Sequence, residues 1–189
     1  MTRSVLLWIG LLSMQTLSQE QAAPPAPYDD DEAYGVYSVL LPHQESYEFA
    51  KGTLVIQLET VSKPIERQCL SAAAARRFKD AIADYEKANT KRWSLQREFQ
   101  SEKPYELVSS DTIKAVFNEY SWDAFYRRYP DSGGYVIMSA VGFNSDKSLA
   151  LVYMGSACGG LCGQWSFHVL EKINGKWKEA SGVQCFTVS

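Results

Sequence analysis

Histidine is scarce in this chain, and no serine motif for nucleophilic catalysis is present. The two histidines are His43 and His168, and no Gly-x-Ser-x-Gly sequence occurs. His43 follows Pro42 in a predicted loop, where we expect a solvated side chain. Asp80 and Asp84 share one face of a predicted helix, and a solvated surface explains them better than an acid–base pair. The sequence therefore predicts no catalytic residues. A hydrolase whose site is assembled from residues distant in sequence is the main alternative to a non-enzymatic protein.

Long basic runs are also missing, and so are long apolar runs after the N-terminal segment. The net charge is −3, and the 19 lysines and arginines are scattered, which argues against nucleic acid as a partner. No segment after residue 18 is long and apolar enough to cross a membrane. We expect a protein, glycan or small-molecule partner of unknown identity, and the sequence leaves monomer and dimer open.

The first 18 residues have the layout of a secretory signal peptide. Arg3 supplies the positive charge, Val5–Leu12 forms an apolar core, and the small residues Thr16 and Ser18 follow it. No cysteine lies near the cleavage region, so no lipid anchor is predicted. We expect the protein to be exported, either to a periplasm or out of the cell.

Export changes the interpretation of the four cysteines, Cys69, Cys158, Cys162 and Cys185. An even number of cysteines in an oxidising compartment indicates disulfides, and four cysteines allow three pairings. We favour Cys158–Cys162 across the loop Gly159–Leu161, which leaves Cys69–Cys185. By chain entropy the short bridge would stabilise the fold by about 2 kcal/mol and the long one by about 5 kcal/mol. The short bridge would mainly shape its loop.

Two other chemistries are open to these cysteines. Thiol–disulfide exchange enzymes usually place two residues between their cysteines at a helix N-terminus, whereas Cys158 and Cys162 enclose three residues between strand-like sequences. Zinc could be held by a set made of Cys158, Cys162, His168 and Cys185, but Cys69 would then be an odd thiol. No Lys-Ser or Lys-Thr follows the glycines, so a phosphate-binding loop is not indicated. A structural disulfide is favoured, and no metal or cofactor is predicted.

The chain divides into a signal peptide (1–18), a proline-rich and acidic linker (19–32) and one α+β domain (33–189). Hydrophobic periodicity predicts helices first and strands later. The predicted helices cover residues 33–41, 71–85, 113–120 and 122–129. The predicted strands cover residues 53–60 (half-buried), 93–99, 135–143, 149–154, 165–173, 176–180 and 183–186.

The fold class expected is N-terminal helices packed on a curved, mostly antiparallel sheet with a C-terminal β-meander. Residues 135–143 and 149–154 are apolar on both faces, as in central strands. Helices can cover one face of such a sheet. For the other face we expect the curved sheet to close on itself, in preference to a dimer interface.

Aromatic and arginine side chains near the end of the helix at 122–129 and beside the cysteine loop are the candidate ligand-binding residues. Arginine mixed with aromatic residues is typical of recognition surfaces, although the tyrosines also fit the apolar stripe of the helix. The candidates are Tyr126, Arg127, Arg128, Tyr129, Trp165 and His168.

The segment from Trp122 to Trp177 resembles uncharacterised exported bacterial proteins. The shared pattern includes Cys158-Gly159, Leu161-Cys162-Gly163, Leu170-Glu171-Lys172 and Gly175-Lys176-Trp177. The resemblance implies a bacterial exported protein with no established activity, and it transfers no catalytic residue. Cys69 and Cys185 lie outside it. Together these observations favour a disulfide-stapled, non-enzymatic binding or cell-envelope-associated module. A hydrolase is the first alternative, and a redox protein using Cys158 and Cys162 is the second.

Overall fold

The computed structural model describes residues 23–41, 52–118, 121–183 and 186–188. Within these ranges it contains five α-helices and one mixed sheet of eight strands, so the predicted α+β class is confirmed. The predicted signal peptide, 1–18, lies outside the described residues. No helix in the described ranges is long and apolar enough to cross a membrane.

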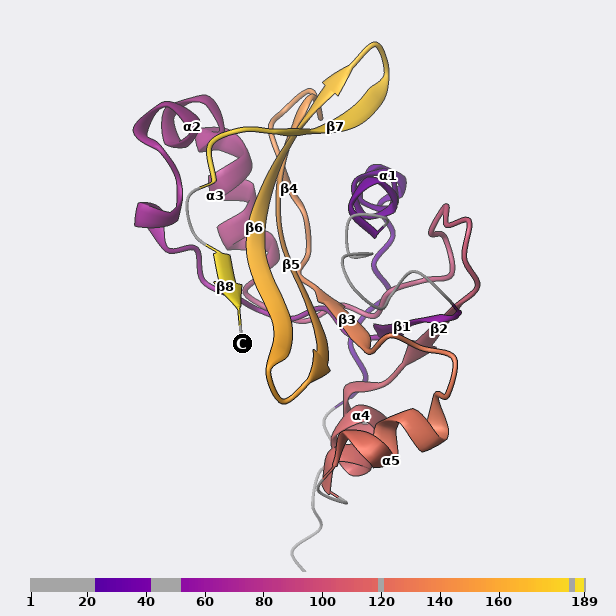
Figure 1. Cartoon of the computed structure of the whole chain (residues 1–189). Coiled ribbons are helices and arrows are strands. Elements are labelled where there is room, and N and C mark those ends of the chain that lie inside the picture. Colours follow the sequence, from indigo (N-terminus) through magenta and orange to yellow (C-terminus); the bar gives the residue numbers. More distant parts are fainter. Residues whose placement is uncertain (1–22, 42–51, 119–120, 184–185, 189) are drawn as a thin grey trace, which may run out of the picture.

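The sheet combines a short parallel part with a long antiparallel meander, in the order β2-β1-β3-β5-β6-β7 (Figure 1). Strand β1 lies parallel to both β2 and β3, and all other pairs are antiparallel. The short strand β4 pairs with β5, and β8 pairs with β6. The strands are β1 (Leu54–Gln57), β2 (Tyr105–Val108), β3 (Tyr135–Met138), β4 (Gly142–Phe143), β5 (Leu149–Gly159), β6 (Cys162–Ile173), β7 (Lys176–Ala180) and β8 (Phe186–Val188).

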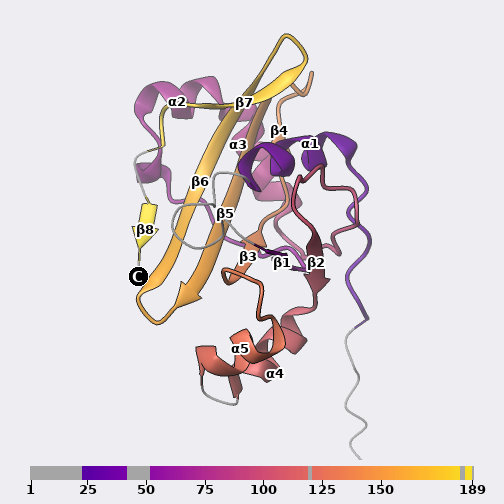
Figure 2. The ribbon, with the colours of Figure 1, turned by 45° about the vertical axis from the view of Figure 1, so that its right-hand side comes forward.

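Helix α1 (Asp31–Leu40) covers one face of the sheet and lies beside β7 (Figure 2). It begins where the Asp30 carboxylate accepts a hydrogen bond from the Glu32 amide, a typical N-cap. Its apolar stripe packs against strand residues that include Ile56 and Val152. The Tyr37 hydroxyl, fully buried in this layer, donates to the Ser139 carbonyl at 2.7 Å. The helix predicted at 33–41 is therefore present.

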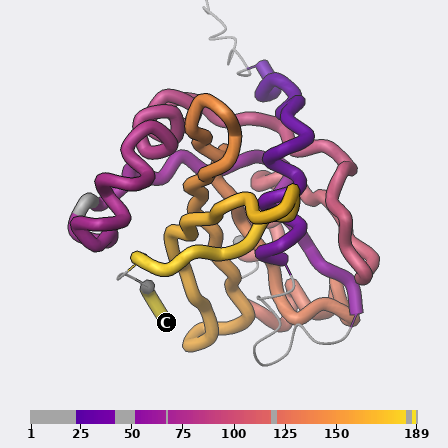
Figure 3. Tube along the Cα trace, turned by 90° about the horizontal axis from the view of Figure 1, so that it is seen from above, coloured from indigo at the N-terminus to yellow at the C-terminus, as the bar shows by residue number. Residues whose placement is uncertain are grey.

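Two helical pairs cover the opposite face. Helices α2 (Ala72–Arg77) and α3 (Lys79–Ala88) pack on β5 and β6 around Leu151, whereas α4 (Ser110–Asn118) and α5 (Trp122–Arg128) pack on β1 around Val55. Figure 3 shows α1 and the α2–α3 pair on opposite sides of the β5–β6 hairpin. Helices thus cover both faces of the central strands. The expectation that the sheet closes on itself to cover one face is wrong, because the helices after β1 supply that cover.

The predicted linker is only partly outside the domain. Tyr28 is 7% exposed, and its hydroxyl accepts a hydrogen bond from the Val141 amide at 2.9 Å. Pro27 forms a β-bridge with Ser94. Pro27 and Tyr28 therefore pack against the domain although they fall in the predicted linker. The bounds 19–32 for a linker and 33–189 for the domain stay a prediction.

Several predicted elements differ in detail. Strand β1 is buried on both faces, not one, because helices lie above and below it. Within the described chain no strand forms at 93–99, where Ser94 makes single bridges to Pro27 and Glu59. The helix predicted at 71–85 divides at Phe78, and the strand predicted at 135–143 divides into β3 and β4. Strand β2 was not predicted.

Candidate functional site

The β5–β6 hairpin ends in the cysteine loop, and its two cysteines are joined. Cys158 and Cys162 form a disulfide with 5.0 Å between their Cα atoms, so the predicted short bridge is confirmed. Gly159 pairs with Cys162 across the hairpin after a shift in register. We call the segment Cys158–Cys162 the stapled loop. Because thiolates and not disulfide sulfurs bind metals, this bond also contradicts the zinc set.

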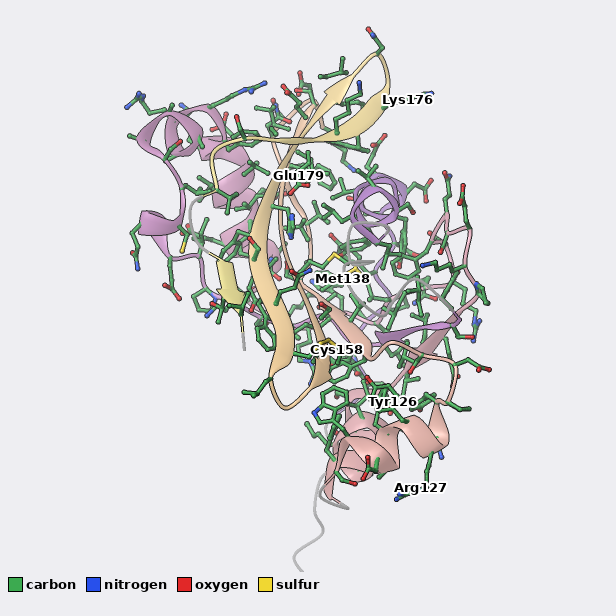
Figure 4. All side chains as sticks on the ribbon, viewed as in Figure 1. Tyr126, Arg127, Met138, Cys158, Lys176 and Glu179 are labelled. Carbon is green, nitrogen blue, oxygen red and sulfur yellow. A yellow bond between two sulfur atoms is a disulfide. The ribbon has the colours of Figure 1, made fainter. Side chains whose placement is uncertain are left out.

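Two long-range contacts hold the base of the stapled loop. The Tyr126 hydroxyl on α5 donates to the Cys158 carbonyl at 2.8 Å, and Figure 4 shows the two residues next to each other. The backbone of Gly134 also approaches this base closely: Gly134 adopts φ +121°, and a Cβ there would lie 2.1 Å from the Ala157 carbonyl oxygen. The loop is therefore fixed by a disulfide, a long-range hydrogen bond and a close backbone contact.

The tip of the stapled loop exposes an apolar side chain on an uncharged frame. Leu161 is 93% exposed, and Val188 of β8, which pairs with Gln164, is 65% exposed. No acidic or basic residue, and no histidine, occurs from Ser148 to Phe167. Contacts made by the loop and its two strand ends would depend on shape and apolar burial, because this stretch itself carries no charge.

Trp165 lies close to the stapled loop, three residues after Cys162. Its indole lies over Gly155 of the neighbouring strand, where a Cβ would come within 1.9 Å of the Trp165 Cδ1 atom. The glycine therefore makes room for the ring, and the half-buried Trp165 is positioned by the sheet itself.

His168 belongs to a different part of the sheet. Its Nδ1 atom lies 2.6 Å from a carboxylate oxygen of Glu179 on β7, and its side chain is 13% exposed. It lies opposite Val152, six residues beyond Cys162 on β6. The structure thus separates His168 from the stapled loop and gives it a carboxylate partner that the sequence did not reveal.

The remaining candidates divide between the core and a groove. Tyr129 is 8% exposed and packs on Phe125, so it belongs to the core. Arg127 and Arg128 line a groove between α4 and α5. The Arg128 Nε donates to the Tyr129 hydroxyl at 3.2 Å, and this hydrogen bond raises the pKa of the guanidinium. Of the six predicted ligand-binding residues, only Tyr126 and Trp165 lie beside the stapled loop.

Cys69 is disulfide-bonded and buried at the end of the 3-10 turn Arg67–Cys69. Its predicted partner, Cys185, lies outside the described residues, so the pairing Cys69–Cys185 stays a prediction. The neighbouring chain favours that pairing, because Leu70 and Val183 form an antiparallel bridge.

Sequence reasoning missed the features that fix and expose the loop. The close approach of Gly134 to Ala157 carries no signal in the sequence, because the two residues are far apart along the chain. The exposure of Leu161 likewise depends on how the hairpin is placed in the fold. Comparisons with protein-family models, curated proteins and solved structures find no match for the chain.

Proposed function

We propose that this chain is an exported, non-enzymatic binding module that recognises a partner protein through the stapled loop. The observation that carries the proposal is the exposure of Leu161 on a loop that is fixed at both ends. A rigid loop loses little conformational entropy when it binds, and an exposed aliphatic side chain can fill a pocket on the partner. The resemblance to exported bacterial proteins supports association with a cell envelope.

The disulfide itself supports export. Disulfides persist in oxidising compartments and are rare in the cytosol. The signal-like first 18 residues agree with this location. Determination of the N-terminal sequence of the protein isolated from its native cells would test the proposal. A chain recovered from the cytosol that still begins at Met1 would contradict export.

A photoreactive residue at position 161 tests the binding role directly, with position 173 as the matched control. Ile173 is another exposed aliphatic residue, 40% exposed, but it lies at the opposite end of β6. Cross-links to a partner should form from position 161 and not from position 173. With the cross-linked partner purified, Leu161→Asp should weaken binding at least about tenfold, the loss expected when one buried leucine contact is removed, and Ile173→Asp should not. Equal affinity of both variants would reject the stapled loop as the binding surface.

The hydrolase alternative is favoured by one observation, the His168–Glu179 contact at 2.6 Å. A carboxylate that orients an imidazole is part of the arrangement that activates nucleophiles. The nearest serine in sequence, Ser166, donates its hydroxyl hydrogen to the Phe167 carbonyl. Hydrolysis of a p-nitrophenyl ester that disappears in His168→Ala would support this alternative over the binding module.

The redox alternative has less support than the hydrolase alternative. Cys158 and Cys162 lie on strands β5 and β6 and not at a helix N-terminus, where a dipole would lower the pKa of a thiol. An insulin-reduction assay with the intact protein tests it, and we expect no activity above that of the Cys158→Ser variant.

A further inference from the structure

A groove of about 530 Å³ lies between α4 and α5. These two helices lie at the end of the molecule that also carries the tip of the β5–β6 hairpin (Figure 1). Side chains from both helices line the groove. The lining residues are Thr112, Ala115, Val116, Ala124, Arg127 and Arg128. Its volume lies within the range of small-molecule sites, about 300–1,000 Å³.

The charge of this groove is positive. Arg127 and Arg128 contribute two guanidinium groups, and no carboxylate belongs to the lining. Among the ion pairs of the described residues, neither arginine takes part. The nearest acidic side chain on α4, Asp111, is engaged by Lys114 at 3.4 Å. Glu106 of β2 has the smallest of the electrostatic effects on Arg128, and neither it nor Asp123, the acidic residue of α5, belongs to the lining.

One of the two guanidinium groups is held in place. The Arg128 Nε donates to the Tyr129 hydroxyl, and the guanidinium lies 5.6 Å from the centre of the same ring. Its terminal N–H groups make no hydrogen bond within the described chain. A planar guanidinium that is already oriented is suited to bidentate contact with a carboxylate or a phosphate.

Cations in the last turn of a helix stabilise that turn, and this effect accounts for basic residues near the end of α5. It does not account for an open space beside them. The space exists because small side chains face it: Ala115 on α4 and Ala124 on α5. Together with Val116 they make one wall apolar, and the Thr112 hydroxyl, hydrogen-bonded to Ser109 Oγ at 2.8 Å, adds a polar group.

We propose that the α4–α5 groove binds a small organic oxyanion, whose carboxylate or phosphate group meets Arg127 and Arg128 and whose apolar body covers Ala115 and Ala124. This site is separate from the stapled loop, because Tyr126 faces Cys158 while the arginines after it face α4. It does not depend on the proposed partner protein.

Isothermal titration calorimetry of the full chain with four probes tests the site. Octanoate and octyl phosphate carry both an oxyanion and an apolar body, octanol lacks the charge, and inorganic phosphate lacks the apolar body. We expect at least one of the first two probes to bind at least about tenfold more tightly than octanol, and more weakly at high salt. Which of the two binds identifies the oxyanion. Equal binding of octanol, or of inorganic phosphate, would overturn the proposal.

Variants separate the groove from the rest of the surface. Arg127→Gln with Arg128→Gln should lower the affinity at least about tenfold, whereas Lys114→Gln, a cation of α4 outside the lining, should leave it unchanged. Ala115→Leu keeps both arginines and fills the groove, so it should also abolish binding. This variant tests the site independently if the double arginine variant fails to fold. Binding that survives Ala115→Leu would overturn the proposal. Leu161→Asp should bind the probe like the unaltered protein, which distinguishes this site from the stapled loop.

Discussion

The Tyr126 hydroxyl donates a hydrogen bond of 2.8 Å to the carbonyl oxygen of Cys158, 32 residues away. This bond connects α5 with the base of the stapled loop, and it uses a side chain whose aromatic neighbours belong to the α4–α5 core. The loop is therefore attached to the domain as well as closed on itself.

Removal of that hydroxyl should weaken the attachment without disturbing the ring. Tyr126→Phe should lower the free energy of unfolding by about 1 kcal/mol, the usual net contribution of one hydrogen bond. Urea denaturation followed by circular dichroism measures the change. The control is Tyr135→Phe, because the Tyr135 ring packs on Phe117 and its hydroxyl makes no hydrogen bond with a described residue. A loss from Tyr135→Phe as large as that from Tyr126→Phe would contradict the assigned role.

Opening the disulfide should affect recognition more than folding. Replacement of Cys158 and Cys162 by serine should lower the free energy of unfolding by only about 2 kcal/mol, because the closed loop is short. Binding to the partner found by cross-linking should fall at least about tenfold, since the loop that presents Leu161 loses its fixed shape. Calorimetric melting and titration of the same sample compare the two effects. Unchanged affinity with a larger loss of stability would show that the bridge serves the fold.

Replacement by alanine should destabilise the protein at Gly134 and have almost no effect at Gly160. Gly134→Ala should destabilise the protein by about 3 kcal/mol, because φ is +121° and the new Cβ would meet the Ala157 carbonyl oxygen. Gly160→Ala is the matched control, since a Cβ there meets nothing within 4 Å, and its effect should stay within about 0.5 kcal/mol. Thermal unfolding of both variants measures the difference, and similar melting temperatures would contradict the close contact at Gly134.

Alkaline pH should unfold the protein through its buried tyrosines. Burial raises the pKa of Tyr34 to about 12 and raises the pKa values of Tyr28, Tyr37 and Tyr85 further above the ordinary value of 10. An unfolded chain loses these protons near pH 10, so the stabilisation by the neutral phenols is complete below pH 10. It is lost as pH rises from 10 towards 12.

Tyrosinate absorbance and circular dichroism recorded together against pH test this expectation. The buried phenols should ionise in the same cooperative step in which the fold is lost. Ionisation of all 11 tyrosines near pH 10 with the fold intact would contradict it.

The local parts of this structure could be predicted from the sequence, and the long-range parts could not. Helix α5 begins after Ser121, whose hydroxyl accepts from the Ala124 amide as its cap pattern indicates. The Asn174-Gly175 turn has positive φ at both residues, as such hairpins require. The Cys158–Cys162 bridge follows from short spacing between two strands. Each of these features depends on a few neighbouring residues.

The candidate site was predicted less well, because neighbouring residues on a helix point in different directions. Tyr126, Arg127 and Arg128 are consecutive, yet Tyr126 faces the stapled loop while the arginines line the groove. Tyr28 lies in a proline-rich stretch that resembles a linker, and long-range contacts such as that with Val141 place it in the core. Parallel pairing of β1 with β2 likewise depends on chain segments some 50 residues apart.

The β5–β6 hairpin extends from the interior of the domain to the stapled loop, with one shift in register between Ala157 and Gly159. Successive residues of β5, such as Leu151 and Val152, belong to two separate hydrophobic clusters, and ten paired positions connect β5 to β6. A movement of the stapled loop relative to the domain would disturb the hydrogen bonds between β5 and β6. We therefore expect the loop to keep the same shape with any partner. Flexible surfaces accept many partners by repacking, and the stiffness of this hairpin favours selectivity for a pocket that already matches it.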